Sequence, residues 1–149
     1  MPEREFTFRV VSPLGTVFNG KARGVTLTTK DGEITVLAGH MPMVSVLVDG
    51  EIRIRTAEKE VWIAVAGGFL ETAGTGESEV TVLSDFAAES DSIEVARVEA
   101  AKARAEQLLQ EKMERRDLMM VERDLQRAIL QLKVAEKARS RRRGSTAPQ

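Results

Sequence analysis

The chain has one histidine, His40, which lies in the stretch EITVLAGHMPMVS. Histidine suits proton transfer near neutral pH and is a common metal ligand. No nearby serine or carboxylate completes a recognisable catalytic arrangement, and the chain offers neither a cysteine nor a second histidine for zinc. Gly39 and Pro42 flank the ring and predict a turn between two strands. We therefore predict no catalytic residue and no metal site, and give His40 a structural or interface role.

Arginines of the second half form the other candidate site. Arg97 and Arg104 are seven residues apart, which is two helical turns and about 10 Å, and Arg127 could approach them from a second helix. Three guanidinium groups can clamp a phosphate-bearing anion. The competing interpretation, which we favour from the residues alone, is a solvated helix face with ordinary ion pairs at i, i+3 or i, i+4: Glu94 with Arg97, Glu111 with Arg115, and Asp124 with Arg127.

Composition excludes several other classes of protein. There is no cysteine, and no phosphate loop or catalytic signature is present in the 149 residues. The longest apolar run, VWIAVAGGFL, is far shorter than the roughly 20 residues of a membrane helix. The stretch MPEREFTF does not resemble a signal peptide. Residues 1–90 carry 8 basic against 13 acidic side chains and residues 91–149 carry 14 against 10, so an acidic half precedes a basic one.

The elements that would position these residues follow two different patterns. Up to about residue 86, short runs alternate with period two, and turn signals separate them about every ten residues, which is typical of an all-β sandwich or barrel. The runs are FTFRVV, GVTLTT, EITVL, MVSVLV, EIRIRT, VWIAVA and EVTVLS. In EIRIRT, isoleucines occupy one face and arginines the other, whereas VWIAVA is apolar on both faces. That strand is expected either to be central and covered on both sides or to contact another protein.

Helical periodicity begins after residue 90. We expect a first helix over about 92–111, capped by Asp91 or Ser92 and carrying two neighbouring small or apolar stripes. These are Ala96, Ala100 and Ala103, and Val98, Ala101, Ala105 and Leu108. A second helix over about 117–138 carries a heptad seam of Leu118, Val121, Leu125, Ala128, Leu132 and Ala135. A short connection between two such helices predicts an antiparallel hairpin.

The connection EKMERRD contains neither glycine nor proline, so nothing local forces a turn. We therefore expect a marginal hairpin that can open into one long helix when a partner covers its apolar stripes. Residues 140–149 are expected to form a basic, disordered tail. The predicted organisation is an α+β chain in two parts: a sandwich over 1–88 and a two-helix domain over 89–139, followed by that tail.

Five motifs in this order resemble the epsilon subunit of bacterial and chloroplast rotary ATP synthases, which is similar to the mitochondrial delta subunit. They are FRVVSPLGTVFNG, DGEITVLAGHMPMV, AVAGGFLET, EVTVLSDFA and RAILQLKVAEK, and the likeness covers about residues 5–139. The resemblance implies a ten-stranded sandwich and a helical hairpin in a non-catalytic, central-stalk subunit. It also implies a place at the membrane periphery, on the cytoplasmic face of a bacterial inner membrane or the stromal side of a thylakoid.

The partners that the resemblance implies are the gamma subunit and the ring of c subunits, with no nucleic acid. Contact with the c-ring would fall on Asp31, Gly32 and Glu33 and on the region of His40. The helices would permit ATP hydrolysis when closed and inhibit it when extended into the catalytic head. In the extended state, basic residues would meet the alpha and beta subunits, and these are Arg115, Arg116, Arg123 and Arg127.

Some relatives bind ATP in the closed hairpin, and this chain matches their motif only in part. Ile93, Arg97, Arg104 and Arg127 match, whereas Glu94 replaces an aspartate, Val98 an alanine and Gln131 an arginine. We therefore expect no cofactor, and ATP only as a weak regulatory ligand or not at all. Two alternatives from other classes stay open: a free-standing sensor of anions or nucleotides on the same scaffold, and a hydrolase that uses His40.

Overall fold

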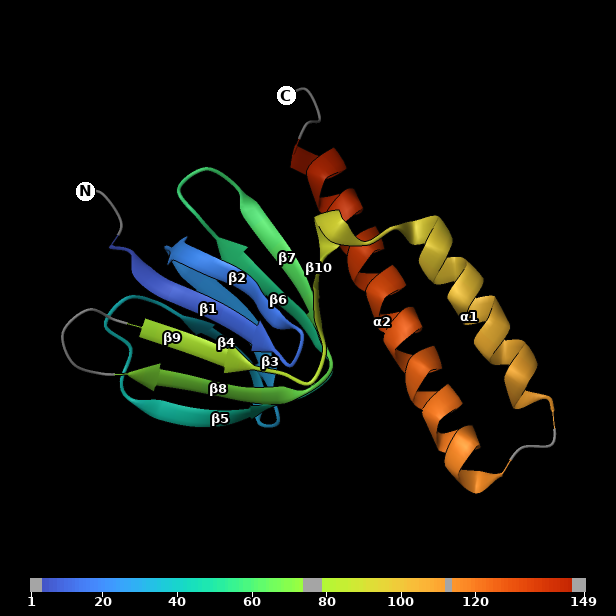
Figure 1. The fold of residues 1–149 in the computed structure, drawn as a ribbon. Helices are drawn as coiled ribbons and strands as arrows, with labels where there is room; N and C mark the ends of the chain where they lie inside the picture. Colours follow the sequence, from blue (N-terminus) through green and yellow to red (C-terminus); the bar gives the residue numbers. More distant parts are fainter. Residues whose placement is uncertain (1–3, 74–78, 112–113, 146–149) are drawn as a thin grey trace. The chain divides into compact units, whose positions relative to one another are not determined.

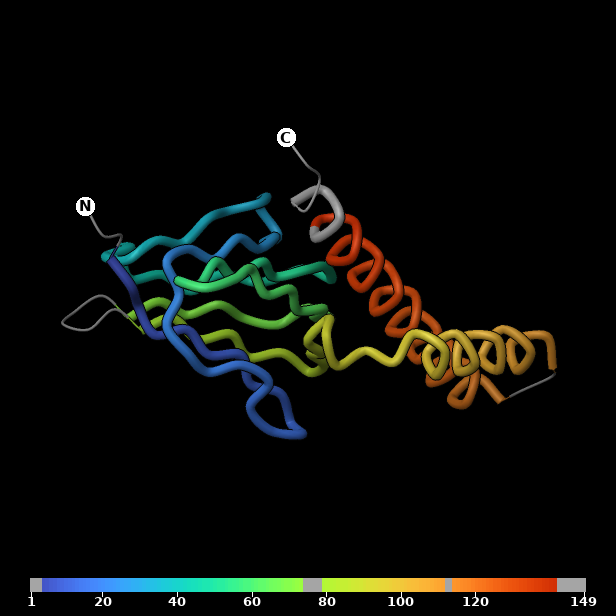
Figure 2. Tube along the Cα trace, turned by 90° about the horizontal axis from the view of Figure 1, so that it is seen from above, coloured from blue at the N-terminus to red at the C-terminus, as the bar shows by residue number. Residues whose placement is uncertain are grey.

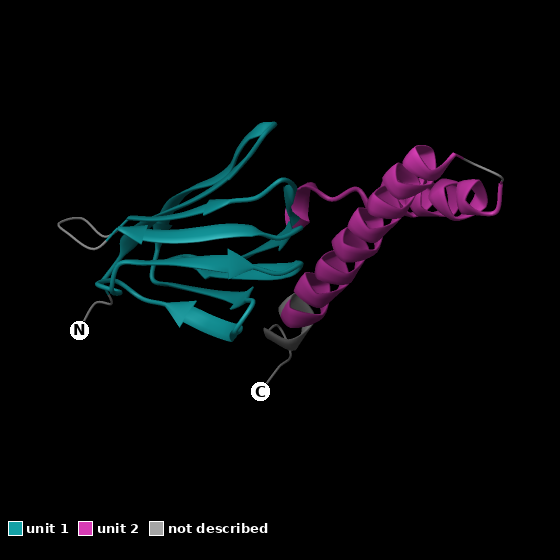
Figure 3. Cartoon of the chain, turned by 90° about the horizontal axis from the view of Figure 1, so that it is seen from below, with its two compact units in different colours: residues 1–89 teal, residues 90–149 magenta. Residues whose placement is uncertain are grey.

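A computed structural model describes residues 4–73, 79–111 and 114–145 of the chain. The chain divides into two compact units, Met1–Glu89 and Ser90–Gln149, which Figure 3 distinguishes by colour. All the strands that the structure describes belong to the first unit, and all the described helices belong to the second. Among the described helices, none combines the length and the apolar character that crossing a bilayer requires.

In its described residues, 4–73 and 79–89, the first unit contains ten strands (Figure 1). Their bounds are β1 Phe6–Ser12, β2 Gly15–Ala22, β3 Gly24–Thr29, β4 Gly32–Val36, β5 Met43–Leu47, β6 Gly50–Arg55, β7 Glu60–Val65, β8 Gly68–Ala73, β9 Glu79–Leu83 and β10 Ala87–Glu89. The predicted sandwich is confirmed, and all seven predicted runs are strands. The seven runs did not include β2, β8 or β10.

The strands join in the order β10-β7-β6-β3-β5-β8-β9-β1-β2, with β4 paired to the other side of β3. A single residue pair, Thr29 with Leu47, links β3 to β5, so the sheet is divided there into two layers. All pairings are antiparallel except that of β1 with β9, which is parallel. The turn between β1 and β2 projects from the body of the sandwich (Figure 2).

The core lies between the two layers, where alternate residues of each strand point inward. Phe6, Phe8 and Val10 of β1 are buried, as are Ile52 and Ile54 of β6, while their neighbours face outward. This confirms the alternation that EIRIRT predicts. All five residues of β7 from Val61 to Val65 are buried, so the first of the two expectations for this strand, coverage on both sides, is also confirmed.

The second unit contains a 3-10 turn, η1 Ser90–Ser92, and two helices, α1 Val95–Leu109 and α2 Arg115–Ser145. The helices pack against each other as the predicted antiparallel pair (Figure 1). The predicted cap at Asp91 or Ser92 is wrong, because residues 90–92 turn tightly and Glu94 occupies the N-cap position without a side-chain hydrogen bond. α2 continues to Ser145 and so includes residues 140–145 of the expected tail, whereas 146–149 lie outside the described residues.

Only one of the two stripes predicted on the first helix is shielded. Ala105 is buried and Val98 and Leu108 are half-buried, although Ala101 of the same stripe is exposed. The stripe of Ala96, Ala100 and Ala103 is exposed. Methyl groups of both stripes are equally apolar, and the sequence therefore could not decide which stripe would be covered. The seam of α2 is shielded along its length, with Ala128 fully buried.

Candidate functional site

His40 lies in the connection between β4 and β5, as predicted, and is held there by hydrogen bonds. Its backbone N–H donates to the Leu37 carbonyl at 3.2 Å, and its ring Nδ1 lies 2.9 Å from the Met41 carbonyl oxygen. Because a carbonyl oxygen only accepts, Nδ1 carries the proton. The Thr72 hydroxyl donates to the same oxygen at 2.7 Å and accepts from the Met43 N–H at 2.8 Å. The half-buried ring is thus part of a fixed turn.

The KDGE turn closes the hairpin between β3 and β4. Thr29 pairs with Gly32 across the hairpin, and Gly32 has a φ of +126°, which a side chain would disfavour. The Thr29 hydroxyl donates to the Gly32 carbonyl at 2.9 Å and accepts from the Asp31 N–H at 3.2 Å. These bonds point the Asp31 and Glu33 carboxylates into solvent from a rigid turn.

The structure does not bring these two candidate regions together. Asp31 immediately precedes β4 and His40 follows it, so the whole strand, about 13 Å of extended chain, separates them. A single flat partner surface at one end of the sandwich can therefore contact one of the two regions but not both. The sequence could not reveal this, because nine residues of spacing do not show whether a chain turns back.

Glu33 takes part in an internal contact. Its carboxylate lies 3.3 Å from the Arg53 guanidinium, which in turn lies 5.6 Å from the centre of the Trp62 ring. The Glu33 side chain is 60% exposed, so the pair is weak. Asp31, by contrast, forms no ion pair with any residue that the structure describes. It is therefore the more available acid of the turn.

The candidate residues of the hairpin do not come together in either of the two grooves described in the second unit. Arg97 and Arg104 are exposed on α1, and Arg127 is half-buried on α2. A groove of about 240 Å³ opens between α1 and α2, and a smaller one of about 190 Å³ is also lined by η1. Ile93 lines the smaller one, but none of these three arginines lines either groove. Arg115, Arg116 and Arg123 are exposed along α2, as a later contact with an acidic surface would require.

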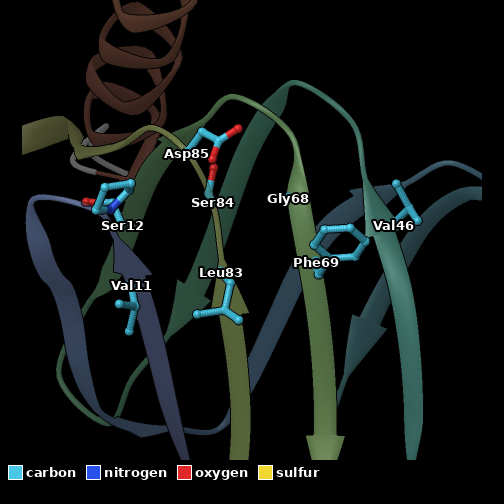
Figure 4. Close-up of a pocket in the computed structure, with 9 residues that line it drawn as sticks. Val11, Ser12, Val46, Gly68, Phe69, Leu83, Ser84 and Asp85 are labelled. Atoms are coloured by element: carbon cyan, nitrogen blue, oxygen red, sulfur yellow. The ribbon is translucent and has the colours of Figure 1, made fainter.

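Sequence reasoning missed an apolar surface on the outer face of the sandwich. Val11, Leu83, Phe69 and Val46 lie side by side on β1, β9, β8 and β5, because Val11 pairs with Leu83, Leu83 with Phe69, and Phe69 with Val46. We call these four residues the apolar row (Figure 4). Leu83, Phe69 and Val46 are 51%, 55% and 47% exposed, which is unusual for neighbouring large apolar side chains on a free surface.

A groove of about 470 Å³ runs along the apolar row (Figure 4). Its remaining lining residues are Ser12, Pro13, Gly68, Ser84 and Asp85. Ser84 is buried, and its hydroxyl lies 2.7 Å from the Gly67 carbonyl and 2.8 Å from the Phe86 carbonyl, so it ties together the two loops that shape the groove. The described residues contain no cluster of acids, histidines or cysteines that could hold a metal ion.

Comparison with known proteins agrees with this architecture. Residues 5–90 match the family model of the ATP synthase delta/epsilon chain β-sandwich domain, and residues 91–136 match that of its long α-helix domain. The ATP synthase epsilon chain of Bacillus mycoides is 34% identical over 133 residues, covering 89% of this chain and 98% of the relative. That of Desulforamulus reducens is 38% identical over 127 residues, covering 85% and 94%.

A solved structure shares the fold. A chain in the cryo-EM structure of the Euglena gracilis mitochondrial ATP synthase, described as containing OSCP, F1 and the c-ring, aligns with a TM-score of 0.59. The alignment covers 94% of this chain and 82% of that one at 20% sequence identity.

Proposed function

Because this chain belongs to the delta/epsilon family of ATP synthase subunits, we propose that it couples rotation of the c-ring to the gamma subunit and that its helices restrain ATP hydrolysis. It is a non-catalytic component of the stalk. The observation that carries the proposal is the match of both family domains, which together cover residues 5–136. They meet next to Glu89, where the two structural units divide.

The apolar row is the proposed docking surface for gamma. A rotor subunit must stay bound under torque, and buried apolar area is the largest source of affinity in lasting complexes. The four side chains of the row lie in register on rigid strands, so they present a preformed surface that loses little conformational entropy on binding.

The KDGE turn is the proposed contact with the c-ring. Asp31 projects from a turn that three local hydrogen-bonding groups hold in place, and a basic or polar loop of the ring would complement it. His40 lies at the far end of β4, so we assign its turn to a different neighbour from the one that Asp31 meets, with gamma as the candidate. Gly32 and Glu33 support the turn that presents Asp31.

The hairpin is the proposed regulatory element. Val95 of α1 and Ala135 of α2 line the same two grooves, so they lie close together in the closed state described here. Opening would separate them and would present Arg115, Arg116, Arg123 and Arg127 to acidic surfaces of the alpha and beta subunits. The described part of the connection, which contains no helix breaker, is consistent with such a change.

ATP is expected to bind weakly or not at all. Beyond the departures at Glu94, Val98 and Gln131, the candidate arginines do not share a described groove. Isothermal titration calorimetry of the full chain with ATP should detect no micromolar affinity; a dissociation constant in that range would contradict the expectation. We also propose that the subunit lies at the membrane periphery, on the cytoplasmic face of a bacterial membrane or the stromal face of a thylakoid.

Three experiments on the assembled complex test the proposal. Deleting residues 90–149 should raise ATP hydrolysis while proton-driven or sodium-driven ATP synthesis continues, because the sandwich retains both docking regions. Unchanged hydrolysis would remove the regulatory role and leave the coupling role.

Conversely, a V95C/A135C disulfide should hold the hairpin closed and abolish the inhibition of ATP hydrolysis, with V95C alone as the control. Asp31→Ala should loosen docking on the c-ring, and coupling equal to wild type would contradict that contact.

A further inference from the structure

The charges beside the apolar row are unevenly distributed. Asp85 lines the groove at the loop end, and its exposed carboxylate forms no ion pair within the described residues. One row further along the same sheet face, Arg9 and Glu71 flank Thr81. The positive charge of Arg9 is offset by Glu79, whose carboxylate is 3.5 Å away. Glu71 is exposed and forms no ion pair with the residues that the structure describes, so the unbalanced charge next to Leu83 and Phe69 is negative.

Asp85 is held at the mouth of the groove by the backbone around it. Its neighbour Ser84 is 6% exposed, and the Ser84 hydroxyl lies within hydrogen-bond distance of the Gly67 and Phe86 carbonyl oxygens. The backbone of the loop therefore has little freedom to carry Asp85 away from the groove. Figure 4 shows Asp85 on the loop that follows Leu83 and Ser84, at the end of the strand. A carboxylate fixed beside an apolar floor complements a cation whose stem is apolar.

We propose that the groove receives a segment of gamma that presents an apolar side chain to Leu83 and Phe69 and a lysine or arginine to Asp85. Asp85 is then a specificity-determining residue: the apolar row supplies affinity, and the carboxylate selects a partner segment with a cation at one position. This inference rests on the proposed docking of gamma at the apolar row. The groove volume of about 470 Å³ accommodates more than one side chain, as such a segment requires.

A binding experiment tests the role of Asp85. The probe is the catalytic head of the same ATP synthase, assembled with gamma but depleted of this chain, and the full-length chain is titrated against it at several salt concentrations. Asp85→Asn should slow association and weaken binding by about fivefold or more at low salt, and should reduce the salt dependence. Glu58→Gln removes the same charge from the exposed turn between β6 and β7 and should bind like wild type. An equal loss in both variants would show a general charge effect and overturn the inference.

A second variant separates this inference from the docking site itself. Phe69→Ser removes an exposed ring from the row, and circular dichroism and urea unfolding establish that the variant folds. If Phe69→Ser weakens binding and Asp85→Asn does not, gamma docks on the row but the proposed ion pair is wrong. If both variants bind like wild type, gamma docks elsewhere and the proposed docking site fails together with the ion pair.

Discussion

Gly68 shows how strictly single residues shape the groove. Its φ of +125° is strained for any side chain, and a Cβ built there would collide with the Leu83 carbonyl oxygen and lie 3.0 Å from the Ser84 Cα. Gly68→Ala should therefore lower the free energy of unfolding by roughly 1–3 kcal/mol from the backbone conformation alone, and separating β8 from β9 should add to this. Urea unfolding measures the change.

Gly50 provides the matched control for that substitution. It lies at the start of β6, its φ is not in the left-handed region, and nothing lies within 4 Å of a Cβ placed there. Gly50→Ala should change the free energy of unfolding by less than about 0.5 kcal/mol. Equal losses at the two glycines would mean that the collision at Gly68 relaxes without cost.

Thr72 is the second residue whose role can be isolated. Its hydroxyl satisfies the Met43 N–H and the Met41 carbonyl, the latter being the group that also accepts from His40. Thr72→Val keeps the shape but leaves the Met43 N–H unpaired and the Met41 carbonyl with His40 as its donor, and should cost about 1–3 kcal/mol in unfolding free energy. Thr81→Val, on the outer face of β9, is the control and should be nearly neutral. A neutral Thr72→Val would mean that water replaces the hydroxyl.

Among the elements, the helical pair offers a comparison between two alanines of α1. Ala105 is 7% exposed and Ala103 is exposed. Ala105→Glu should force a carboxylate into the contact between α1 and α2 and destabilise the hairpin by roughly 2 kcal/mol or more. Ala103→Glu should have little effect. Limited proteolysis in the second unit reads out the difference, and equal resistance of the two variants would contradict the observed face.

The sequence predicts strands better than it predicts their faces. In EIRIRT, isoleucine and arginine alternate, so the inward face is unambiguous, and the structure buries Ile52 and Ile54. In MVSVLV both alternating sets contain large apolar residues, and only the pairing of β5 with β8 decides that Val46 faces outward. The apolar row was therefore invisible in the sequence, because its members come from four separate strands and meet only through their register.

Short or irregular elements were missed for a related reason. β2 includes two glycines and polar residues on both faces, with a register shift opposite Val10 and Val11, and so lacks a clean period. β10 has only 3 residues, too few to show a period at all. The candidate arginines lie on helices, as the periodicity predicts, but periodicity along one helix could not show which cavities the second helix would close.

At the scale of the whole molecule, the first unit should fold without the second. Every residue of the main apolar core lies between Phe6 and Val82 or is Ala87, which packs against it, so the fragment 1–89 contains the complete core. It should unfold cooperatively in urea, with Trp62, the single tryptophan, as its fluorescent reporter. A fragment without a cooperative transition would show that the sandwich depends on the helices. The full-length chain serves as the reference.

The change in residue usage along the sequence anticipates the two-part architecture. Glycine and proline concentrate in the strand-rich half because hairpin turns need them, and the helical half contains little of either before residue 144. No comparable change in residue usage marks the surfaces through which the two units contact partner proteins. They depend on which side chains a fold brings to its surface, as the separation of Asp31 from His40 by β4 demonstrates.

The parallel pairing of β1 with β9 has a consequence for synthesis of the chain on the ribosome. Thr7 lies beside Glu79 and Val11 beside Leu83. The first strand must therefore wait until the ninth has been synthesised before its second edge can form backbone hydrogen bonds. At roughly 5–20 residues added per second, this wait lasts several seconds. During it, β1 can pair only with β2, and the apolar inward residues of this hairpin remain uncovered. The nascent subunit is therefore most open to aggregation, and to capture by a chaperone, before residue 83 emerges.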